Sequence, residues 1–217
     1  MKFGRVLLAL LFLMGALVLL TGCFETNSPP VANFTTSPSS GTAPLSVSFN
    51  ASSSYDSDGS IATYEWDFGD GSHGSGITTS HTYTRAGIYT VTLTIRDNEG
   101  ASTKVENKIF VAAAVPYDEL FRHNESYIGD VVYFRGKIIQ VVEKLFGGYT
   151  WRVATKQNEY FGYIDDILWV NYDGPRFLEG DIIDLYGTVK GLKTYTAILG
   201  QQVTIPEIDA LKVDLVQ

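Results

Sequence analysis

Apolar and polar residues alternate along several short stretches of the first half of the chain, and this period of two is typical of β-strands. In residues 45–50 the apolar side chains fall on one face, and residues 64–68 place three aromatic side chains on one face. Residues 87–95 repeat the pattern, with an inward face made of Tyr89, Val91, Leu93 and Ile95. Turn-forming clusters of Asp, Asn and Gly separate these stretches. Residues 31–113 are therefore predicted to form a β-sandwich of six or seven short antiparallel strands.

Longer alternating stretches follow in residues 117–217, after a short helix predicted near 117–123. Two of the predicted strands contain a glycine near the middle, Gly136 and Gly187, where small barrels coil sharply. The strands are predicted over residues 131–143, 149–155, 167–172, 182–189 and roughly 203–215. Five strands of this kind predict a small closed Greek-key barrel. Residues 112–116, Ala-Ala-Ala-Val-Pro, are expected to be a short hinge between the two units.

The N-terminus has the pattern of an export signal. Lys2 and Arg5 precede an uninterrupted apolar run over residues 6–20, which is shorter than the roughly 20 residues that span a bilayer. The run ends in Leu-Thr-Gly-Cys, which resembles the lipobox of prokaryotic lipoproteins. The resemblance implies that residues 1–22 are a signal peptide, that Cys23 carries a lipid, and that residues 23–30 form a tether. Cys23 is the only cysteine, and a retained signal anchor is the alternative. The mature chain is expected outside the cytoplasm, on the extracellular or periplasmic side of a membrane.

Charge disfavours nucleic acid as a partner. The chain has 16 Lys+Arg against 24 Asp+Glu, a net charge of −8. Residues 114–217 alone hold 10 Lys or Arg against 15 Asp or Glu, a net charge of −5. Nucleic-acid binding depends on basic residues that neutralise phosphates, so neither half has the required balance.

Four motifs in the first unit closely resemble a PKD (polycystic kidney disease) domain: SDGSI, YEWDFGDG, HTY and GIYTVTL. The resemblance covers about residues 29–113 and implies an immunoglobulin-like sandwich that serves outside the cell as a spacer or adhesion module. Trp66 is expected in the core, and His81 and Tyr83 are expected to make structural hydrogen bonds. Asp67 and Asp70 are either turn residues or a nucleophile or metal pair. Some PKD domains bind calcium through loop carboxylates, which makes a structural calcium site conceivable at Asp56, Asp58, Asp67 and Asp97.

The sequence GDVVYFRGKI at 129–138, echoed at 179–189, resembles an OB-fold; another small barrel or sandwich is the alternative. OB-folds bind oligonucleotides, oligosaccharides or proteins across their second and third strands. That face predicts the ligand-binding candidates Trp151, Arg152, Tyr160, Tyr163, Trp169 and Tyr172. Because side chains alternate along a strand, about half of them must point inward. A second candidate is a basic and aromatic patch, expected in a loop, made of Lys190, Lys193 and Tyr195.

Catalytic motifs are missing from the sequence. The three histidines are scattered, no nucleophile elbow or phosphate-binding glycine loop is present, and no cofactor is expected. Asp165 and Asp166 are either a metal or acid pair or a cap at the start of a strand. The predicted fold class is thus all-β: an immunoglobulin-like PKD sandwich followed by a five-stranded OB-like barrel. The predicted function is a non-catalytic, lipid-anchored surface protein that binds polysaccharide or protein.

Two alternatives to this function stay open: a structural subunit of an envelope complex, and a surface hydrolase that uses two carboxylates. The pattern Asn-x-Ser/Thr also marks possible glycosylation sites at Asn33, Asn50 and Asn124.

Overall fold

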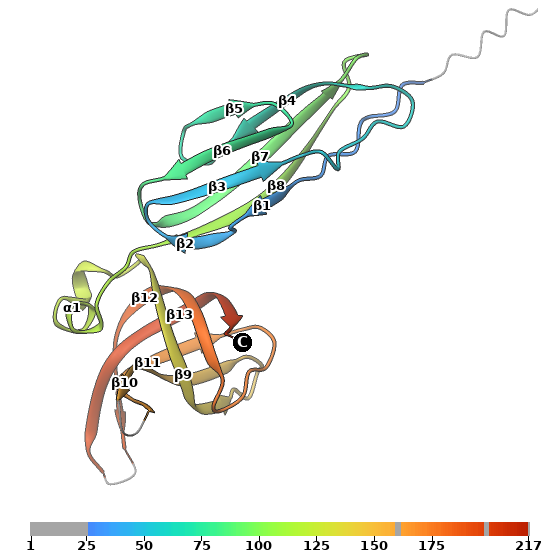
Figure 1. Ribbon diagram of the computed structural model, residues 1–217. Helices are drawn as coiled ribbons and strands as arrows, with labels where there is room; N and C mark the ends of the chain where they lie inside the picture. Colours follow the sequence, from blue (N-terminus) through green and yellow to red (C-terminus); the bar gives the residue numbers. More distant parts are fainter. Residues whose placement is uncertain (1–25, 159–161, 198–199, 217) are drawn as a thin grey trace, which may run out of the picture.

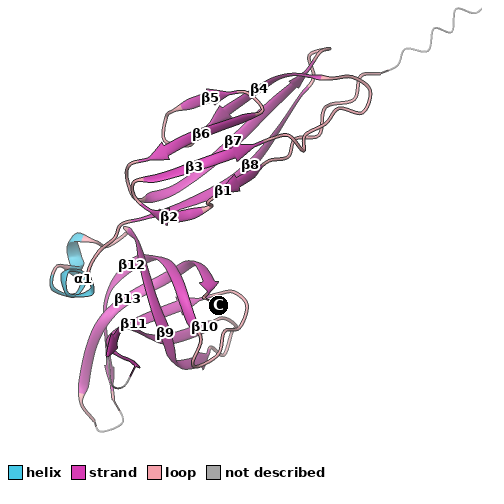
Figure 2. Ribbon diagram, viewed as in Figure 1, coloured by secondary structure: helices cyan, strands magenta, loops and turns pink. Residues whose placement is uncertain are grey.

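The computed structural model describes residues 26–158, 162–197 and 200–216. Over these residues the chain forms two β-rich units stacked end to end (Figure 1). Strands make up nearly all of its regular structure, with a short helical segment between the units (Figure 2). Cys23 and the apolar run before it lie outside the described residues, so the predictions of a signal peptide and of a lipid anchor stay predictions.

The first unit is a sandwich of two sheets. One sheet has the order β1-β3-β6, with strands Thr35–Ser37, Leu45–Asn50 and Thr78–Tyr83. The other has the order β2-β8-β7-β4-β5, with strands Ser40–Thr42, Ser102–Ala112, Gly87–Asp97, Ile61–Asp67 and His73–Ser75. The alternating stretches identified in the sequence therefore become β3, β4 and β7, and their apolar faces meet between the sheets.

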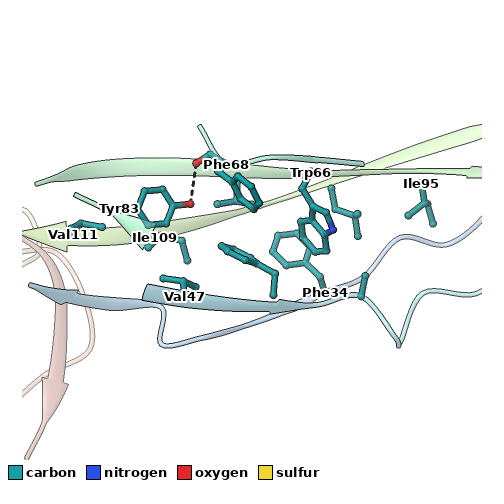
Figure 3. Close-up of a cluster of buried hydrophobic side chains, with 12 residues drawn as sticks. Phe34, Val47, Trp66, Phe68, Tyr83, Ile95, Ile109 and Val111 are labelled. Carbon is teal, nitrogen blue, oxygen red and sulfur yellow. Dashed lines mark hydrogen bonds between the residues drawn. The ribbon is translucent and has the colours of Figure 1, made fainter. Parts of the chain in front are cut away.

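Aromatic side chains fill the space between these two sheets (Figure 3). Trp66 is 1 % exposed, stands edge-on to Phe34 with ring centroids 5.0 Å apart, and donates its indole N–H to the Gly76 carbonyl at 2.8 Å. The Tyr83 hydroxyl donates to the Phe68 carbonyl at 3.0 Å, the dashed line in Figure 3. The prediction of Trp66 as the core aromatic is confirmed, and its polar atom is satisfied, as burial requires.

The second unit is a closed barrel of five strands in the order β10-β11-β13-β12-β9. Helix α1 (Tyr117–Arg122) and a 3-10 turn (Asn124–Ser126) precede it. Neighbouring strands are antiparallel except β11 and β13, which are parallel. The strands are β9 (Val131–Glu143), β10 (Tyr149–Asn158), β11 (Gly162–Tyr172), β12 (Ile182–Thr196) and β13 (Gln202–Leu215).

The mid-strand glycines lie where two backbones approach closely. A Cβ atom added to Gly136 would come within 2.5 Å of a Val153 methyl group. One added to Gly187 would collide with the side chain of Ile208. Both positions therefore exclude any larger residue. The irregularity expected at a mid-strand glycine is found at Gly187, where the register of β12 against β13 shifts between Tyr186 and Gly187.

Strand β12 is longer than predicted, whereas β13 has nearly the predicted bounds. The register of β12 against β13 shifts between Val189 and Gly191, and Gly191 has a φ of +131° that favours glycine. This irregularity lets β12 continue to Thr196, and β13 runs through Pro206 without interruption. The predicted loop after residue 189 is therefore the outer half of a long hairpin.

The predicted hinge at residues 112–116 needs correction at its first two residues, which pack against the barrel. Ala112 is fully buried against Val131 and Tyr186. The Ala113 amide donates to the Val131 carbonyl at 2.8 Å, and Ala113 forms a parallel β-bridge with the barrel. In addition, the ammonium group of Lys212 donates to the Ser40 hydroxyl at 2.6 Å. The last strand of the sandwich thus docks directly onto the barrel.

Candidate functional site: an aromatic groove on the barrel

Two half-buried residues on neighbouring strands begin the site. Arg152 on β10 and Trp169 on β11 are direct cross-strand partners, and both point away from the barrel core because their neighbours at 151, 153, 168 and 170 point into it. Antiparallel pairing therefore places a guanidinium and an indole side by side on the outer surface.

The outer half of the β12–β13 hairpin adds two more side chains to this surface. The Tyr195 ring lies against Trp169, with centroids 5.5 Å apart, and the Arg152 guanidinium lies 5.3 Å from the centroid of Tyr195. The ammonium group of Lys193 lies 5.8 Å from the centroid of Trp169. Two rings and two cations thus form one cluster, which we call the aromatic cluster.

A groove of about 680 Å³ runs past the aromatic cluster. Its described lining combines apolar surface, two side-chain amides and one charged group, from Gln140, Val142, Arg152, Trp169, Tyr195, Thr196, Ala197 and Gln201. Aromatic faces beside a few polar donors are the usual composition of a small-molecule or sugar site. The arrangement can stack a flat ligand and donate hydrogen bonds to it.

The Arg152 guanidinium is poorly satisfied by the described residues. One of its terminal N–H groups donates to the Gln140 side-chain oxygen at 3.4 Å, a long hydrogen bond. Its Nε is buried and has no hydrogen-bond partner in the described part of the chain. An arginine has five N–H donors, four of them on the two terminal nitrogens, so the capacity left for a ligand is at those terminal N–H groups.

Nearby carboxylates on the outer surface are engaged elsewhere. Asn171 donates to Glu207 and to Asp209, each at 3.0 Å. Lys190 forms an ion pair with Asp209 at 3.4 Å. These contacts give Glu207 and Asp209 partners outside the aromatic cluster, and the cluster faces the groove.

The structure divides the six residues predicted from the sequence. Arg152 and Trp169 line the groove, but Trp151 is fully buried, so its prediction as an exposed binding residue is wrong. Tyr172 packs against Trp151 with centroids 4.5 Å apart, and burial raises the pKa of its hydroxyl. Tyr172 is therefore half core and faces the opposite way from Trp169.

Two of the six predicted residues cannot be placed fully. Tyr160 lies outside the described residues. The backbone of Tyr163 belongs to β11 and pairs with Gln157, while its side chain is outside the description.

The predictions for two polar patches need correction. Lys193 and Tyr195 lie on β12 and not in a loop, and they join the aromatic cluster, whereas Lys190 pairs with Asp209 outside the groove. Asp165 and Asp166 lie within β11, so they do not cap the start of a strand. The Asp166 carbonyl accepts a hydrogen bond from the Thr155 hydroxyl at 2.8 Å.

In the sandwich, the polar residues of the YEWDFGDG and HTY motifs support a turn. The His81 ring stacks on Phe68 with centroids 4.4 Å apart, and its Nε2 lies 2.7 Å from a carboxylate oxygen of Asp70. Burial alone would raise the pKa of Asp70, but hydrogen bonds from His81 and from the Ser72 amide lower it overall. Asp67 accepts the Gly69 amide at 2.9 Å. These contacts fit the turn role that the sequence left open for both aspartates.

The four aspartates proposed for calcium do not share one place. Asp97 pairs with Ile61 at one end of β4, and Asp67 lies at the other end. The prediction that Asp67 shares a calcium site with the other three aspartates is therefore wrong. One oxygen of Asp97 already accepts the amides of residues 99, 100 and 101. Across residues 26–158, 162–197 and 200–216, no three His, Cys, Asp or Glu side chains are placed to hold a metal ion.

One predicted glycosylation site is inaccessible. Asn124 is 2 % exposed, so the structure rules out a glycan there without local unfolding. Asn33 and Asn50 are exposed, and their modification stays a prediction.

The sequence analysis missed an apolar tip on the barrel. Leu145 is 90 % exposed and Phe146 is 98 % exposed, in the turn that joins β9 to β10. Two large apolar residues in a tight turn that ends in Gly147 and Gly148 were the available signal. Adjacent apolar side chains with so little packing are typical of a contact surface.

Comparisons with known proteins place the first unit. Residues 27–111 match the family model described as PKD domain. Collagenase ColA of Clostridium perfringens is 39 % identical over 80 residues, which are 37 % of this chain and 7 % of that protein. The chain thus spans less than a tenth of that relative, and the match concerns the sandwich. Residues 27–111 are a PKD domain.

Two solved structures are also similar. The PKD1 domain of Vibrio anguillarum Epp is 42 % identical, with 41 % of this chain and 99 % of that chain covered and a TM-score of 0.36. A structure titled as carbohydrate-binding modules from the beta-sandwich superfamily is 21 % identical. The match covers 88 % of this chain and 84 % of that chain, with a TM-score of 0.43. Within the described residues, no helix is both long enough and apolar enough to cross a bilayer.

Proposed function

We propose that this chain is an exported, lipid-anchored, non-catalytic binding protein, in which the PKD sandwich is a stalk and the barrel binds a polysaccharide in its outer groove. The observation that carries the proposal is the aromatic cluster beside the groove, because aromatic faces with neighbouring hydrogen-bond donors suit sugar rings. The PKD match supports the stalk, since a segment of this kind also occurs as a small part of a much longer collagenase.

We further propose that the barrel is an OB-fold. In chain order its strands pair as first, second, third, fifth and fourth around a closed ring. The groove lies across the second and third strands, β10 and β11, and beside the turn between the fourth and fifth. These are the strands and one of the loops with which OB-folds bind their ligands.

A glycan array tests the proposed function, with the mature chain and two variants. Trp169→Ala removes one ring of the aromatic cluster, and we expect it to abolish the glycan signal of the parent chain. Tyr55→Ala is the matched control, because Tyr55 is a 57 % exposed aromatic residue on the sandwich, and it should bind as the parent does. Equal binding by Trp169→Ala and the parent would show that the groove is not the sugar site.

A second candidate function is a structural subunit of a cell-envelope complex. The exposed apolar tip favours it, because Leu145 and Phe146 have nothing to pack against among the described residues. A photo-crosslinking residue at Phe146 in intact cells should capture a single recurrent protein if this function holds. The same residue at Tyr55 is the control, and capture of the same protein from both positions would count against docking by the tip.

A further inference from the structure

The aromatic cluster has a charge opposite to that of the barrel that carries it. Residues 114–217 have a net charge of −5, yet Arg152 is the one charged residue in the described lining of the groove. Lys193 stands at its edge over Trp169. The surrounding acidic surface repels anions at longer range. A positive site on such a domain therefore indicates a ligand that is recognised by its charge at close contact.

These two cations also differ from three basic residues of the barrel that have carboxylate partners. Arg135 pairs with Asp184 at 2.7 Å, and Lys190 and Lys212 pair with Asp209 and Asp214. Lys212 also lies over a ring, that of Tyr186, but among the described residues Arg152 and Lys193 have their ring contacts and no ion pair. A cation held over a ring keeps its charge available to a third group.

Resting on the proposed function, we infer that the groove selects an acidic polysaccharide, one whose sugars carry carboxylates. The planar guanidinium of Arg152 matches a carboxylate with two parallel N–H donors, and within the described part of the chain its terminal nitrogens make one hydrogen bond, at 3.4 Å. Trp169 and Tyr195 supply ring faces for the sugar, and Gln140 and Gln201 supply amides for its hydroxyls. A neutral sugar leaves the guanidinium without an anion.

Nucleic acid fits the same site less well. A nucleic acid carries one phosphate per nucleotide, and its binding grooves follow that backbone with a track of Lys and Arg. The site here offers Arg152 in the groove and Lys193 beside it, in a domain with a surplus of carboxylates. Charges spaced along a sugar chain match this arrangement better than a continuous phosphate backbone.

Calorimetric titration of the mature chain with matched pairs of oligosaccharides tests the inference. Each pair consists of an oligouronate, either oligogalacturonate or oligomannuronate, and its methyl ester, which has the same ring and no charge. We expect at least one oligouronate to bind ten times more tightly than its ester or better. That preference should weaken as salt is raised, because the charges are exposed.

Variants assign the preference to the groove. Arg152→Gln and Lys193→Gln should each reduce the preference for acid over ester, and Arg152→Lys should retain part of it. Lys190→Gln is the matched control, because Lys190 lies on β12 as Lys193 does and pairs with Asp209 outside the groove. This variant should keep the full preference. Thermal unfolding of each variant identifies any loss of binding that comes from loss of the fold.

The outcomes separate the inference from the proposed function. Equal binding of acid and ester overturns the inference and leaves polysaccharide binding intact. Failure of the parent chain to bind any glycan, in the titrations and on the array, overturns both. Tighter binding of a thymidine oligonucleotide than of every oligouronate overturns the inference in favour of nucleic acid.

Discussion

The three tryptophans of this chain lie in three different environments, and the contrast between Trp151 and Trp169 gives a direct test of the barrel. Trp151 is fully buried and contacts Tyr172 and Phe177. Trp169 is half-buried on the outer surface. The perturbation is the same in both cases, a substitution by alanine, so the difference in unfolding free energy reports the difference in packing.

The magnitudes follow from burial. Replacing a core tryptophan by alanine costs about 3–5 kcal/mol, because buried surface is lost and a cavity remains. Trp169→Ala loses one ring pair, worth about 0.5–1.5 kcal/mol, and one cation–ring contact of similar size, so about 1–2 kcal/mol is expected. Since m-values in urea are about 2 kcal/mol/M, the midpoint should fall by about 2 M for Trp151→Ala and by less than 1 M for Trp169→Ala.

A third variant, Trp151→Phe, refines the test. The indole N–H of Trp151 is buried without a hydrogen-bond partner among the described residues, and such a group costs about 1–3 kcal/mol. Phenylalanine removes that penalty while it keeps most of the aromatic contact. We therefore expect Trp151→Phe to cost clearly less than Trp151→Ala.

Urea unfolding followed by far-UV circular dichroism and by tryptophan fluorescence provides the assay. Each single-alanine variant keeps one tryptophan in the barrel and Trp66 in the sandwich, so both units retain a fluorescent reporter. Equal midpoint shifts for Trp151→Ala and Trp169→Ala would refute the assignment of one residue to the core and the other to the surface. Equal shifts would also remove the basis for the groove, because the groove depends on the same orientation of side chains along β10 and β11.

Three further changes test other parts of the molecule. Gly136→Val would press a new side chain against Val153, and a loss of about 1–3 kcal/mol in urea unfolding is expected. Burial, reinforced by a hydrogen bond to Asp184, raises the pKa of Tyr133 to about 12. The contribution of Tyr133 to stability should therefore be constant between pH 7 and 10 and be lost as pH rises toward 12. Thermal melts across that range should show a smaller loss in Tyr133→Phe. Cys23→Ser should abolish metabolic labelling by an alkyne fatty acid, which the parent should show by in-gel fluorescence.

The sandwich was the most predictable part of the molecule because its signals are local. The alternation in residues 87–95 survives directly in β7, where Val91, Leu93 and Ile95 are fully buried. Trp66 shares one face of an alternating run with Tyr64 and Phe68, and that aromatic face is the one that packs into the core. Short strands joined by tight turns leave little freedom of register, so each local pattern already specifies its place in the core.

The groove was only half predictable because it depends on long-range pairing. Residues 151 and 152 both suit a binding face, and the pattern alone does not say which one points outward; a shift of one residue exchanges them. Lys193 and Tyr195 were identified as a patch but not as partners of Trp169. Their contact requires β12 to continue past the irregularity at Gly191, and the sequence around that glycine is just as typical of a turn.

The junction shows why composition misled the prediction of a hinge. A run of alanines suggests a flexible connection, yet small side chains are also what a close contact between two surfaces requires. Ala112 is fully buried beside Tyr186, and Ala113 continues the chain into a bridge with the barrel. Tyr133 packs on Tyr186 and donates to Asp184, which Arg135 also holds. These contacts tie the last sandwich strand to the face of β9 and β12, so the connection between the two units is packed against the barrel.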